Sequence, residues 1–212
     1  MARVALIWGA GGGIGRAFAE KLKADGWQII AVSRDADNLA GAADYPLAAD
    51  IADPFSVQRA TLAVGQEAGE AQLFIYAAGD ITAEPASRMA PDTFRRILDA
   101  NLTGAYNAVH YSLPLLAPDA PLVFLGAVSE RMRLPGLSAY AAAKAGLEAF
   151  AEALRKEERK RQIIVVRPGA VKTRFWKKVP FQMPGNALSP EALAEKVIEA
   201  IAAGHQGALD IA

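Results

Sequence analysis

The chain has 212 residues, which suits one large domain whose core needs no disulfide to hold it. It contains no cysteine, which excludes disulfides and thiolate metal sites. Its 23 Lys and Arg residues balance its 23 Asp and Glu residues, so the basic excess typical of nucleic-acid-binding proteins is absent. No apolar run approaches the roughly 18 residues that a membrane-spanning helix needs. We therefore expect a soluble, cytoplasmic, single-domain protein (residues 1–212) with no nucleic-acid or membrane partner.

Short aliphatic segments alternate with longer helical patterns along the whole chain. Most of the apolar segments lack polar alternation, which is typical of parallel strands buried on both faces. The predicted strands are Val4–Trp8, Gln28–Val32, Pro46–Ala48, Leu73–Ala77, Leu122–Leu125, Ile163–Arg167 and Ala208–Ile211. The predicted helices run from Ile14 to Asp25, Phe55 to Val64, Pro91 to Leu116 with a bend near Asn101, Ser138 to Arg161, and Pro190 to Ala203. The alternation predicts an α/β fold with a doubly wound, mostly parallel sheet and helices on both faces.

A glycine-rich loop links the first predicted strand to the first predicted helix. Its sequence is Gly9-Ala10-Gly11-Gly12-Gly13-Ile14-Gly15, which fits G-x-x-x-G-x-G through Gly9, Gly13 and Gly15. Glycines in this context let the backbone approach a pyrophosphate closely, and the helix N-terminus offers free N–H groups. The alternative is a tight turn that binds no ligand. Because the loop follows the first strand of an alternating chain, the sequence favours a dinucleotide site.

Five further segments follow this loop in order along the chain. They are Asp50-Ile51, Ala77-Ala78-Gly79, Asn101-Leu102-Thr103-Gly104, Tyr140-Ala141-Ala142-Ala143-Lys144 and Arg167-Pro168-Gly169-Ala170-Val171-Lys172-Thr173. Together with the loop they resemble the motifs of the short-chain dehydrogenase/reductase family, in its shorter-subunit branch, over nearly the whole chain. The loop also fits G-x-x-G-x-x-G, the spacing of the longer epimerase-like branch, but the chain has no room for that branch's larger C-terminal substrate region. The resemblance implies a Rossmann fold, a nicotinamide cofactor and a homodimer or homotetramer paired through the two long middle helices.

The resemblance gives the Tyr-x-x-x-Lys helix motif a catalytic role. Tyr140 would exchange a proton with a carbonyl or alcohol oxygen, and a nearby ammonium plus an oxidised nicotinamide would lower its pKa from about 10. Lys144, four residues later on the same helix face, would also hold the nicotinamide ribose. Asn101 would anchor a water that connects Lys144 to solvent. The alternatives are a half-buried aromatic residue at Tyr140 and a helix-bend residue at Asn101.

The resemblance also implies a set of cofactor contacts. They come from Gly9, Gly11, Gly13, Ile14 and Gly15 in the loop, from Asp50 and Ile51 to the adenine, from Ala78 and Gly79, and from Pro168, Gly169, Val171 and Thr173 around the nicotinamide. After the second strand comes Ser33-Arg34-Asp35. Ser33 and Arg34 suit the 2′-phosphate of NADP, whereas Asp35 is one position too late to act as the acid of an NAD site. The sequence therefore favours NADP(H) over NAD(H), with a mixed-charge surface turn as the alternative.

One expected catalytic part is missing. The family places a serine 13 residues before the tyrosine, and this chain has Ala127 there. Ser129 and Ser138 are the candidates to replace it by a local shift. That serine donates a hydrogen bond to the reacting oxygen, and losing one such donor costs on the order of 10²–10³ in kcat. Two functions therefore stay open: an NADP(H)-dependent oxidoreductase, or an NADP(H)-binding sensor or interaction subunit with little catalysis.

The segment after Thr173 resembles the mobile loop that covers the substrate, near residues 174–189. In this loop Trp176, Phe181 and Met183 would line an apolar pocket or simply pack the loop down, and Val128 to Leu134 would form another wall. The substrate would be a small or medium carbonyl compound or alcohol, which the sequence does not name. The two histidines, His110 and His205, have no acidic partners at ligand spacing, so no metal site is expected.

Overall fold

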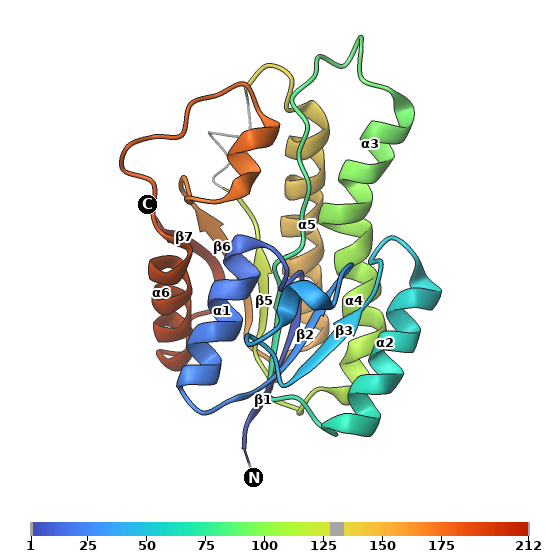
Figure 1. Cartoon of the computed structure of the whole chain (residues 1–212), viewed down its shortest axis with the longest axis vertical. Helices are drawn as coiled ribbons and strands as arrows, with labels where there is room; N and C mark the ends of the chain where they lie inside the picture. Colours follow the sequence, from blue (N-terminus) through green and yellow to red (C-terminus); the bar gives the residue numbers. More distant parts are fainter. Residues whose placement is uncertain (1, 128–133, 212) are drawn as a thin grey trace.

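A computed structural model gives the fold of residues 2–127 and 134–211. Within this part of the chain, seven strands form one parallel sheet at the centre of the molecule (Figure 1). In sheet order they are β3 (Tyr45–Ala48), β2 (Gln28–Ser33), β1 (Val4–Trp8), β4 (Leu73–Tyr76), β5 (Leu122–Leu125), β6 (Ile163–Pro168) and β7 (Gly207–Ile211). Every predicted strand is present, and each end lies within one residue of its predicted position. The predicted doubly wound α/β fold is confirmed.

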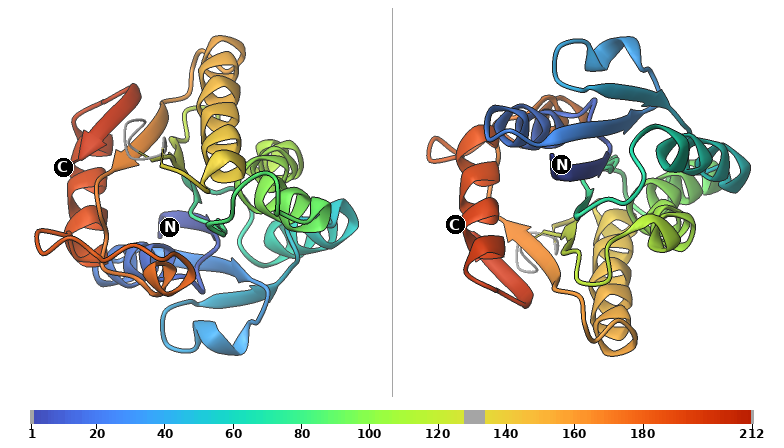
Figure 2. Two further views of the ribbon diagram at one scale, coloured as in Figure 1. Left: turned by 90° about the horizontal axis from the view of Figure 1, so that it is seen from above. Right: turned by 90° about the horizontal axis from the view of Figure 1, so that it is seen from below.

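Helices cover both faces of the sheet (Figure 2). On one face lie α1 (Gly13–Ala24) and α6 (Pro190–Ala202); on the other lie α2 (Pro54–Glu67), α4 (Gly104–Ser112) and α5 (Ser138–Glu157). Two apolar cores result, because side chains of β1 alternate between the faces: Ile7 packs with Phe18 of α1, whereas Trp8 packs on the α2 side. None of the described helices has the length and apolar composition to cross a membrane.

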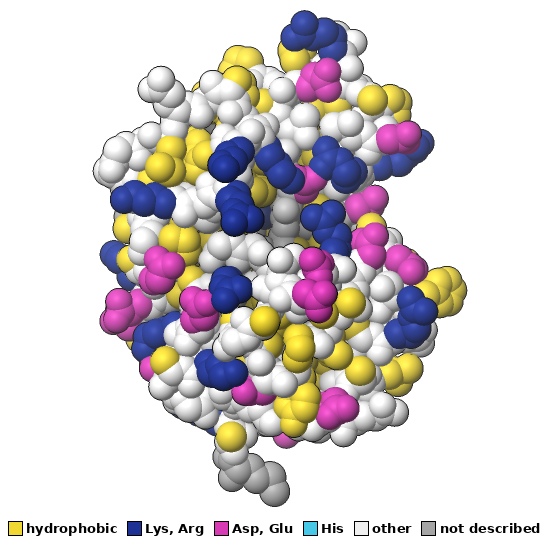
Figure 3. Space-filling model, in the orientation of Figure 1, with side chains coloured by type: hydrophobic (Ala, Val, Ile, Leu, Met, Phe, Trp, Pro, Cys, Tyr) yellow, Lys and Arg dark blue, Asp and Glu magenta, His cyan; other side chains and the backbone are white. Residues whose placement is uncertain are grey.

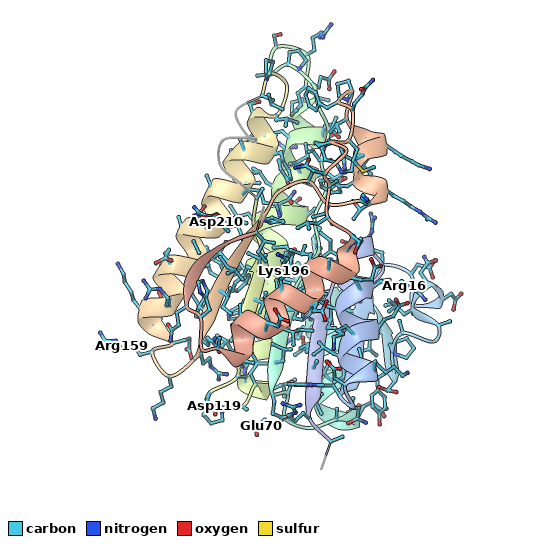
Figure 4. The ribbon with its side chains drawn as sticks, turned by 90° about the vertical axis from the view of Figure 1, so that its left-hand side faces the viewer. Arg16, Glu70, Asp119, Arg159, Lys196 and Asp210 are labelled. Carbon is cyan, nitrogen blue, oxygen red and sulfur yellow. The ribbon has the colours of Figure 1, made fainter. Side chains whose placement is uncertain are left out.

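The order of the strands creates a crevice at one edge of the sheet. From β1 the chain moves outward through β2 to β3, and α2 then carries it back to β4 on the other side of β1. Ligands of such sheets bind at this switch point, outside the carboxyl ends of the strands. Figure 4 shows Glu70 and Asp119 at the opposite edge, where β4 and β5 begin. The predicted motif residues of the loops follow carboxyl ends of strands, whereas Asn101, Tyr140 and Lys144 lie on helices.

The predicted bend near Asn101 is a π-helical segment. The helix predicted from Pro91 is α3 (Pro91–Leu98), followed by the π-helix η2 (Asp99–Thr103), α4 and the short 3₁₀-helix η3 (Leu113–Leu115). The widened turn frees the carbonyl of Ala100, which accepts a hydrogen bond of 2.9 Å from the buried Tyr76 hydroxyl. Asn101 Nδ2 donates to the Ile97 carbonyl at 2.8 Å. Such bulges occur often at functional sites.

Helix α5 is shorter than predicted. It ends at Glu157, four residues before the predicted end at Arg161. The chain has to turn here because β6 begins at Ile163. Arg161, the predicted last residue of the helix, is only 8% exposed: its guanidinium donates to the carbonyls of Leu116 and Ala117 and pairs with Glu158 at 3.0 Å. The arginine thus supplies a donor to the Leu116 carbonyl and a second donor to the Ala117 carbonyl, which also accepts from the Ala120 N–H at 3.0 Å.

An ion-pair cluster ties the edge strand β7 to its neighbours. Arg167 at the end of β6 donates to both carboxylate oxygens of Asp210, at 2.7 and 2.8 Å. A third guanidinium nitrogen of Arg167 donates a hydrogen bond to the Glu148 carboxylate of α5 at 3.1 Å. Asp210 lies on β7 in Figure 4, on the side of the molecule where β6 and β7 run together. A bidentate pair of this kind fixes geometry as well as adding energy, so it orients the segment that follows β6.

Candidate active site

The glycine loop is held by direct backbone contact with the end of β4. Gly9 has φ of +84°, and a β-carbon there would lie 2.3 Å from the Ala78 nitrogen. A β-carbon on Gly15 would lie 2.4 Å from the Gly9 carbonyl oxygen. No other residue type fits these two positions without moving the backbone. The loop therefore lies directly against the Ala78-Gly79 turn, at the switch point.

The same loop also touches the ends of β2 and β6. A β-carbon on Gly11 would lie 3.0 Å from Ser33 Cβ, and one on Gly13 would lie 3.0 Å from the Thr173 methyl carbon. Helix α1 begins at Gly13 with no capping side chain and no acidic residue in its first turn. Its first N–H groups and its positive dipole end are therefore suited to an anion, while Ile14 packs against the core beneath.

The turn after β2 presents Arg34 outward. Asp35 directs its carboxylate back to the 3₁₀-helix η1 (Asp37–Leu39), where it accepts hydrogen bonds from Asp37 N at 3.0 Å and Asn38 Nδ2 at 2.7 Å. The Ser33 hydroxyl donates to the Asp35 carbonyl and accepts from the Asp35 N–H at 3.1 Å. Arg34 itself is exposed. The geometry thus leaves Arg34 as the charged group facing solvent at this end of the crevice.

The segment after β3 is held from α4. Asn107 of α4 donates to the Ile51 carbonyl at 3.0 Å. Asp50 is exposed, and one of its carboxylate oxygens accepts from the Ala52 N–H at 3.0 Å. The half-buried Ile51 side chain packs against the core on this face. Asp50 and Ile51 therefore lie at the edge of the crevice beyond the β2 turn, on the side of Arg34.

Lys144 and Asn101 meet above Gly79. Lys144 is 4% exposed and donates from Nζ to the Leu125 carbonyl at 2.6 Å. Asn101 is fully buried, and its Nδ2 bonds to the Asp80 carbonyl at 2.7 Å, while its Oδ1 has no partner among the described residues. A β-carbon on Gly79 would lie 2.9 Å from this Oδ1 and 3.8 Å from Lys144 Nζ. Both polar atoms thus border one small space that only glycine leaves open.

Tyr140 lies one turn before Lys144 on α5. Its half-buried ring is 6.0 Å from that of Phe175, and Lys144 Nζ lies 5.7 Å from the centre of the Tyr140 ring. Burial raises the pKa of Tyr140 above its usual value, and burial lowers the pKa of Lys144 to about 7. The lowering expected for Tyr140 is therefore not produced by the polypeptide alone. Desolvation outweighs the neighbouring amine, which itself loses charge.

The position of the missing serine is occupied by Ala127, two residues after β5 ends. Ser138, the first residue of α5, is exposed and lines a hollow with Met89, Phe94 and Arg95. Met89 of this hollow also packs in the small apolar cluster that Tyr140 joins. Ser129, the other candidate, and most of the Val128 to Leu134 wall lie outside the described residues. Position 127 itself supplies no hydroxyl.

The segment after β6 forms a closed loop over this end of the sheet. Gly169, next to Pro168, donates to the Ile211 carbonyl at 2.7 Å, and Val171 pairs with Leu188. Within the loop, the 3₁₀-helix η5 (Arg174–Lys178) begins after Thr173, whose hydroxyl accepts from Phe175 N at 3.3 Å.

For Trp176, the structure favours the second of the two alternatives left open by the sequence. Trp176 packs the loop down, since its indole donates to the Val171 carbonyl at 2.8 Å, and Met183 is 44% exposed. Phe175, which the sequence analysis did not single out, is the aromatic residue that contacts Tyr140.

Asp80 is a second residue that the sequence analysis missed. It follows Gly79 directly, its side chain is 13% exposed, and it pairs with Arg96 of α3 and with Lys178 of η5 at 2.5 Å. No three histidine, aspartate or glutamate side chains come together as metal ligands in residues 2–127 and 134–211. The charge of the Asp80 carboxylate is instead balanced by Arg96 and Lys178. Because Lys178 lies 98 residues away in sequence, no local pattern signals the pair.

Comparison with known proteins identifies the family. A model of the short-chain dehydrogenase family matches residues 3–183. The 3-oxoacyl-[acyl-carrier-protein] reductase FabG of Salmonella typhimurium is 30% identical over 181 residues, covering 81% of this chain and 74% of that protein. The reductase MabA of Mycobacterium tuberculosis is 29% identical over 177 residues, covering 82% and 71%.

Solved structures share the fold over almost the whole chain. A short-chain oxidoreductase from Thermus thermophilus is 35% identical with a TM-score of 0.82, covering 94% of this chain and 95% of that one. A 3-ketoacyl-(acyl-carrier-protein) reductase from Brucella melitensis, solved with NADH, has a TM-score of 0.87 at 24% identity and covers 99% and 96%. With its parallel sheet, its glycine loop and the Tyr140–Lys144 pair on α5, the chain belongs to the short-chain dehydrogenase family.

Proposed function

We propose that the chain is an NADP(H)-dependent oxidoreductase acting on a small or medium carbonyl compound or alcohol. The observation that carries this proposal is the meeting of Lys144 Nζ and Asn101 Oδ1 above Gly79, with Tyr140 one turn away at the switch point of the sheet. Two buried polar groups border a space kept open by a glycine, and a proton-carrying hydroxyl lies beside them. This combination suits the nicotinamide ribose of the cofactor together with the nicotinamide ring.

The residues present fit a nicotinamide dinucleotide. The α1 N-terminus lacks a side-chain cap and an acidic first turn, as pyrophosphate binding needs. The unpartnered Asn101 Oδ1 lies in a fully buried side chain, where an acceptor without a donor is costly unless a water or ligand hydroxyl meets it. When bound, the nicotinamide supplies or accepts the hydride of the reaction. Lys144 would hold the ribose hydroxyls, and Pro168, Gly169, Val171 and Thr173 would border the nicotinamide.

Tyr140 would move the proton. Because burial raises its pKa, its hydroxyl is protonated at neutral pH and suits donation to a carbonyl oxygen as that oxygen gains charge. Removal of a proton from an alcohol requires the phenolate, which needs a positive charge nearby. Lys144, with a pKa of about 7, regains its charge when an anion or hydroxyl acceptor joins it. The site by itself therefore favours reduction of a carbonyl over oxidation of an alcohol.

A catalytically weak NADP(H)-binding protein is the second candidate. Ala127 favours it, because an alanine offers no hydrogen bond to the developing oxyanion. The two candidates share the cofactor site and differ only in turnover. The substrate panel for separating them includes aldehydes, ketones, quinones and 3-oxoacyl thioesters, the last because FabG and MabA are 3-oxoacyl-[acyl-carrier-protein] reductases.

The preference for NADP(H) should reside in Arg34. We expect NADPH to bind more tightly than NADH, and Arg34→Ala to erase most of the difference. One charge-assisted contact is worth about 1.5–3 kcal/mol, or roughly tenfold or more in affinity. Fluorescence titration measures both affinities, with exposed Arg159→Ala at the far edge as the control (Figure 4). Equal affinities of the native protein for the two cofactors would contradict this assignment.

Tyr140 and Ala127 should act in opposite directions on turnover. We expect Tyr140→Phe to abolish NADPH-dependent reduction while leaving NADPH binding intact, since only the hydroxyl is lost. Ala127→Ser should raise kcat, by at most about 10²-fold, because it restores a donor near the developing oxyanion. Steady-state kinetics with Tyr45→Phe on β3 as control measure both effects. If an active native enzyme keeps its rate after Tyr140→Phe, Tyr140 is not the acid; an unchanged rate after Ala127→Ser means that another group polarises the carbonyl.

The buried Lys144 amine should leave a signature in folding stability. Between pH 7 and 10.5 the unfolded chain keeps a proton on Lys144 that the folded chain releases, so the native protein gains stability as pH rises through this window. Lys144→Met lacks this dependence. We therefore expect the stability of the variant relative to native protein to fall with pH, by up to about 1.4 kcal/mol per pH unit. Urea unfolding at pH 7–10 tests this, with Lys156→Met as control; a pH-independent difference would refute it.

We further propose that the protein pairs through α4 and α5. Exposed alanines form a stripe along α5 at Ala142, Ala145, Ala149 and Ala153, and Tyr106 of α4 is 50% exposed. A small-residue stripe lets two helices approach closely, and an exposed aromatic ring is typical of interface cores. The partner that we propose is a second copy of this chain, in a homodimer or homotetramer.

Sedimentation velocity tests the assembly. We expect a species larger than the 22.4 kDa chain at micromolar concentration. Ala145→Glu should dissociate it, because two charges would be buried face to face, and far-UV circular dichroism should stay unchanged. A native protein that sediments only as a monomer would rule the interface out.

A further inference from the structure

The Asp80 carboxylate joins three segments that are distant in sequence. Its Oδ1 accepts hydrogen bonds from Lys178 Nζ of η5 at 2.5 Å and from the Ile81 N–H at 2.9 Å. Its Oδ2 pairs with Arg96 of α3, which in turn donates to the Thr82 hydroxyl at 2.9 Å. The Asp80 side chain is largely buried, whereas those of its two cationic partners are half-exposed. The turn after β4, helix α3 and the substrate loop are therefore held together by one carboxylate with a cation at each oxygen.

The pair with Asp80 is the polar contact that attaches η5 to the rest of the molecule. The other hydrogen bonds of η5 in residues 2–127 and 134–211 stay within the loop that follows β6. Phe175 N donates to the Thr173 hydroxyl at 3.3 Å, and the Trp176 indole donates to the Val171 carbonyl at 2.8 Å. Both bonds order the loop internally and leave its position over the sheet free. That position therefore depends on the ion pair at the end of η5.

The same turn also supports the reacting site. The Asp80 carbonyl accepts a hydrogen bond from Asn101 Nδ2 at 2.7 Å, and Gly79 just before it leaves open the space that Asn101 Oδ1 borders. Helix η5, bonded to the Asp80 side chain, carries Phe175, whose ring lies 6.0 Å from that of Tyr140. Asp80 is thus bonded through its main chain to Asn101 and through its side chain to the segment that contacts Tyr140.

We propose that Asp80 is a positioning residue that holds η5 over Tyr140 through Lys178, and that the reacting site opens when this ion pair separates. That η5 covers a reacting site rests on the proposed oxidoreductase function, whereas the attachment of η5 does not. Figure 3 shows Lys and Arg side chains gathered over η5 and α3 on this face of the molecule. Without the Asp80 charge, Arg96 and Lys178 would repel each other and drive η5 away from α3.

Chymotrypsin measures the opening of η5 without any substrate. It cleaves after Phe175 and Trp176, and none of the test variants changes these two residues. Cleavage of a segment that opens transiently follows the population of its open form. Mass spectrometry locates the cuts, and far-UV circular dichroism verifies that each variant is folded.

Loss of the ion pair should speed cleavage in η5. We expect Lys178→Met to raise the rate roughly fivefold, since it removes one partly exposed ion pair. Asp80→Asn should raise it more, because its two cations then repel each other, and adding Lys178→Met to Asp80→Asn should slow cleavage again. Lys178→Arg should restore the native rate, since a guanidinium also binds a carboxylate. Lys177→Met, at the adjacent exposed lysine of η5, is the matched control and should cleave like native protein.

Stopped-flow fluorescence separates positioning from a loss of structure. We expect Lys178→Met to speed both the binding and the release of NADPH by a similar factor and to leave its Kd close to native, because η5 is held closed both before and after binding. A damaged loop would instead weaken the binding of NADPH. A raised Kd without faster binding would therefore overturn the proposal.

The outcomes distinguish this proposal from the proposed function. Faster cleavage in η5 of Lys178→Met and Asp80→Asn supports the attachment even if the protein reduces no compound of the substrate panel, and the oxidoreductase proposal then fails alone. Native cleavage rates in both variants refute the attachment, even in an active reductase. Cuts spread over the whole chain refute it as well, since they report general unfolding. If Asp80→Asn does not fold, Lys178→Met and Lys178→Arg decide the question, because the half-exposed Lys178 lies outside the core.

Discussion

The close approach of the glycine-loop backbone to its neighbours is the constraint on which the rest of the site depends. Gly9 touches the Ala78 backbone, Gly11 touches Ser33 and Gly13 touches Thr173. The Gly9 contact leaves no space for a β-carbon, and those of Gly11 and Gly13 leave little, so the loop packs closely on the end of β2 and on the segments after β4 and β6. A pyrophosphate at that helix end then lies within reach of groups from several strands, as the switch point of a doubly wound sheet provides.

The catalytic side of the site depends on polar groups kept buried. Burial lowers the pKa of the Lys144 amine to about 7. The Oδ1 of Asn101 has no hydrogen-bond donor among the described residues. Such groups lower stability unless a ligand or water completes their hydrogen bonds. The π-helical turn that places Asn101 is itself supported by Tyr76 from the end of β4. The irregular helix, supported by β4, and α5 thus combine to hold two polar groups, Asn101 Oδ1 and Lys144 Nζ, near Gly79. Such an arrangement is costly and typical of functional sites.

Much of the fold follows from local patterns, and the site follows from motifs. Continuous apolar runs predicted the five inner strands, because both faces of the sheet are covered there, whereas the edge strands β3 and β7 are alternately exposed. The bend at Asn101 was predicted within the π-helical turn. The helix end at Arg161 was predicted four residues too late, because the partners of this arginine, the Leu116 and Ala117 carbonyls, lie more than 40 residues away. Asp80 and Lys178 likewise meet only through the tertiary fold. Phe175 stands beside Trp176, and sequence alone does not tell which of the two faces Tyr140.

The central claim is that the residues around Gly79 and the glycine loop hold an NADP(H) molecule across the switch point. A crystal structure of the protein grown with NADP⁺ tests it most directly. We predict the pyrophosphate at the α1 N-terminus, the nicotinamide ribose hydroxyls at Lys144 Nζ, and the 2′-phosphate at Arg34. A dinucleotide bound elsewhere, or one whose ribose lies out of reach while Lys144 keeps its 2.6 Å bond to the Leu125 carbonyl, would contradict it.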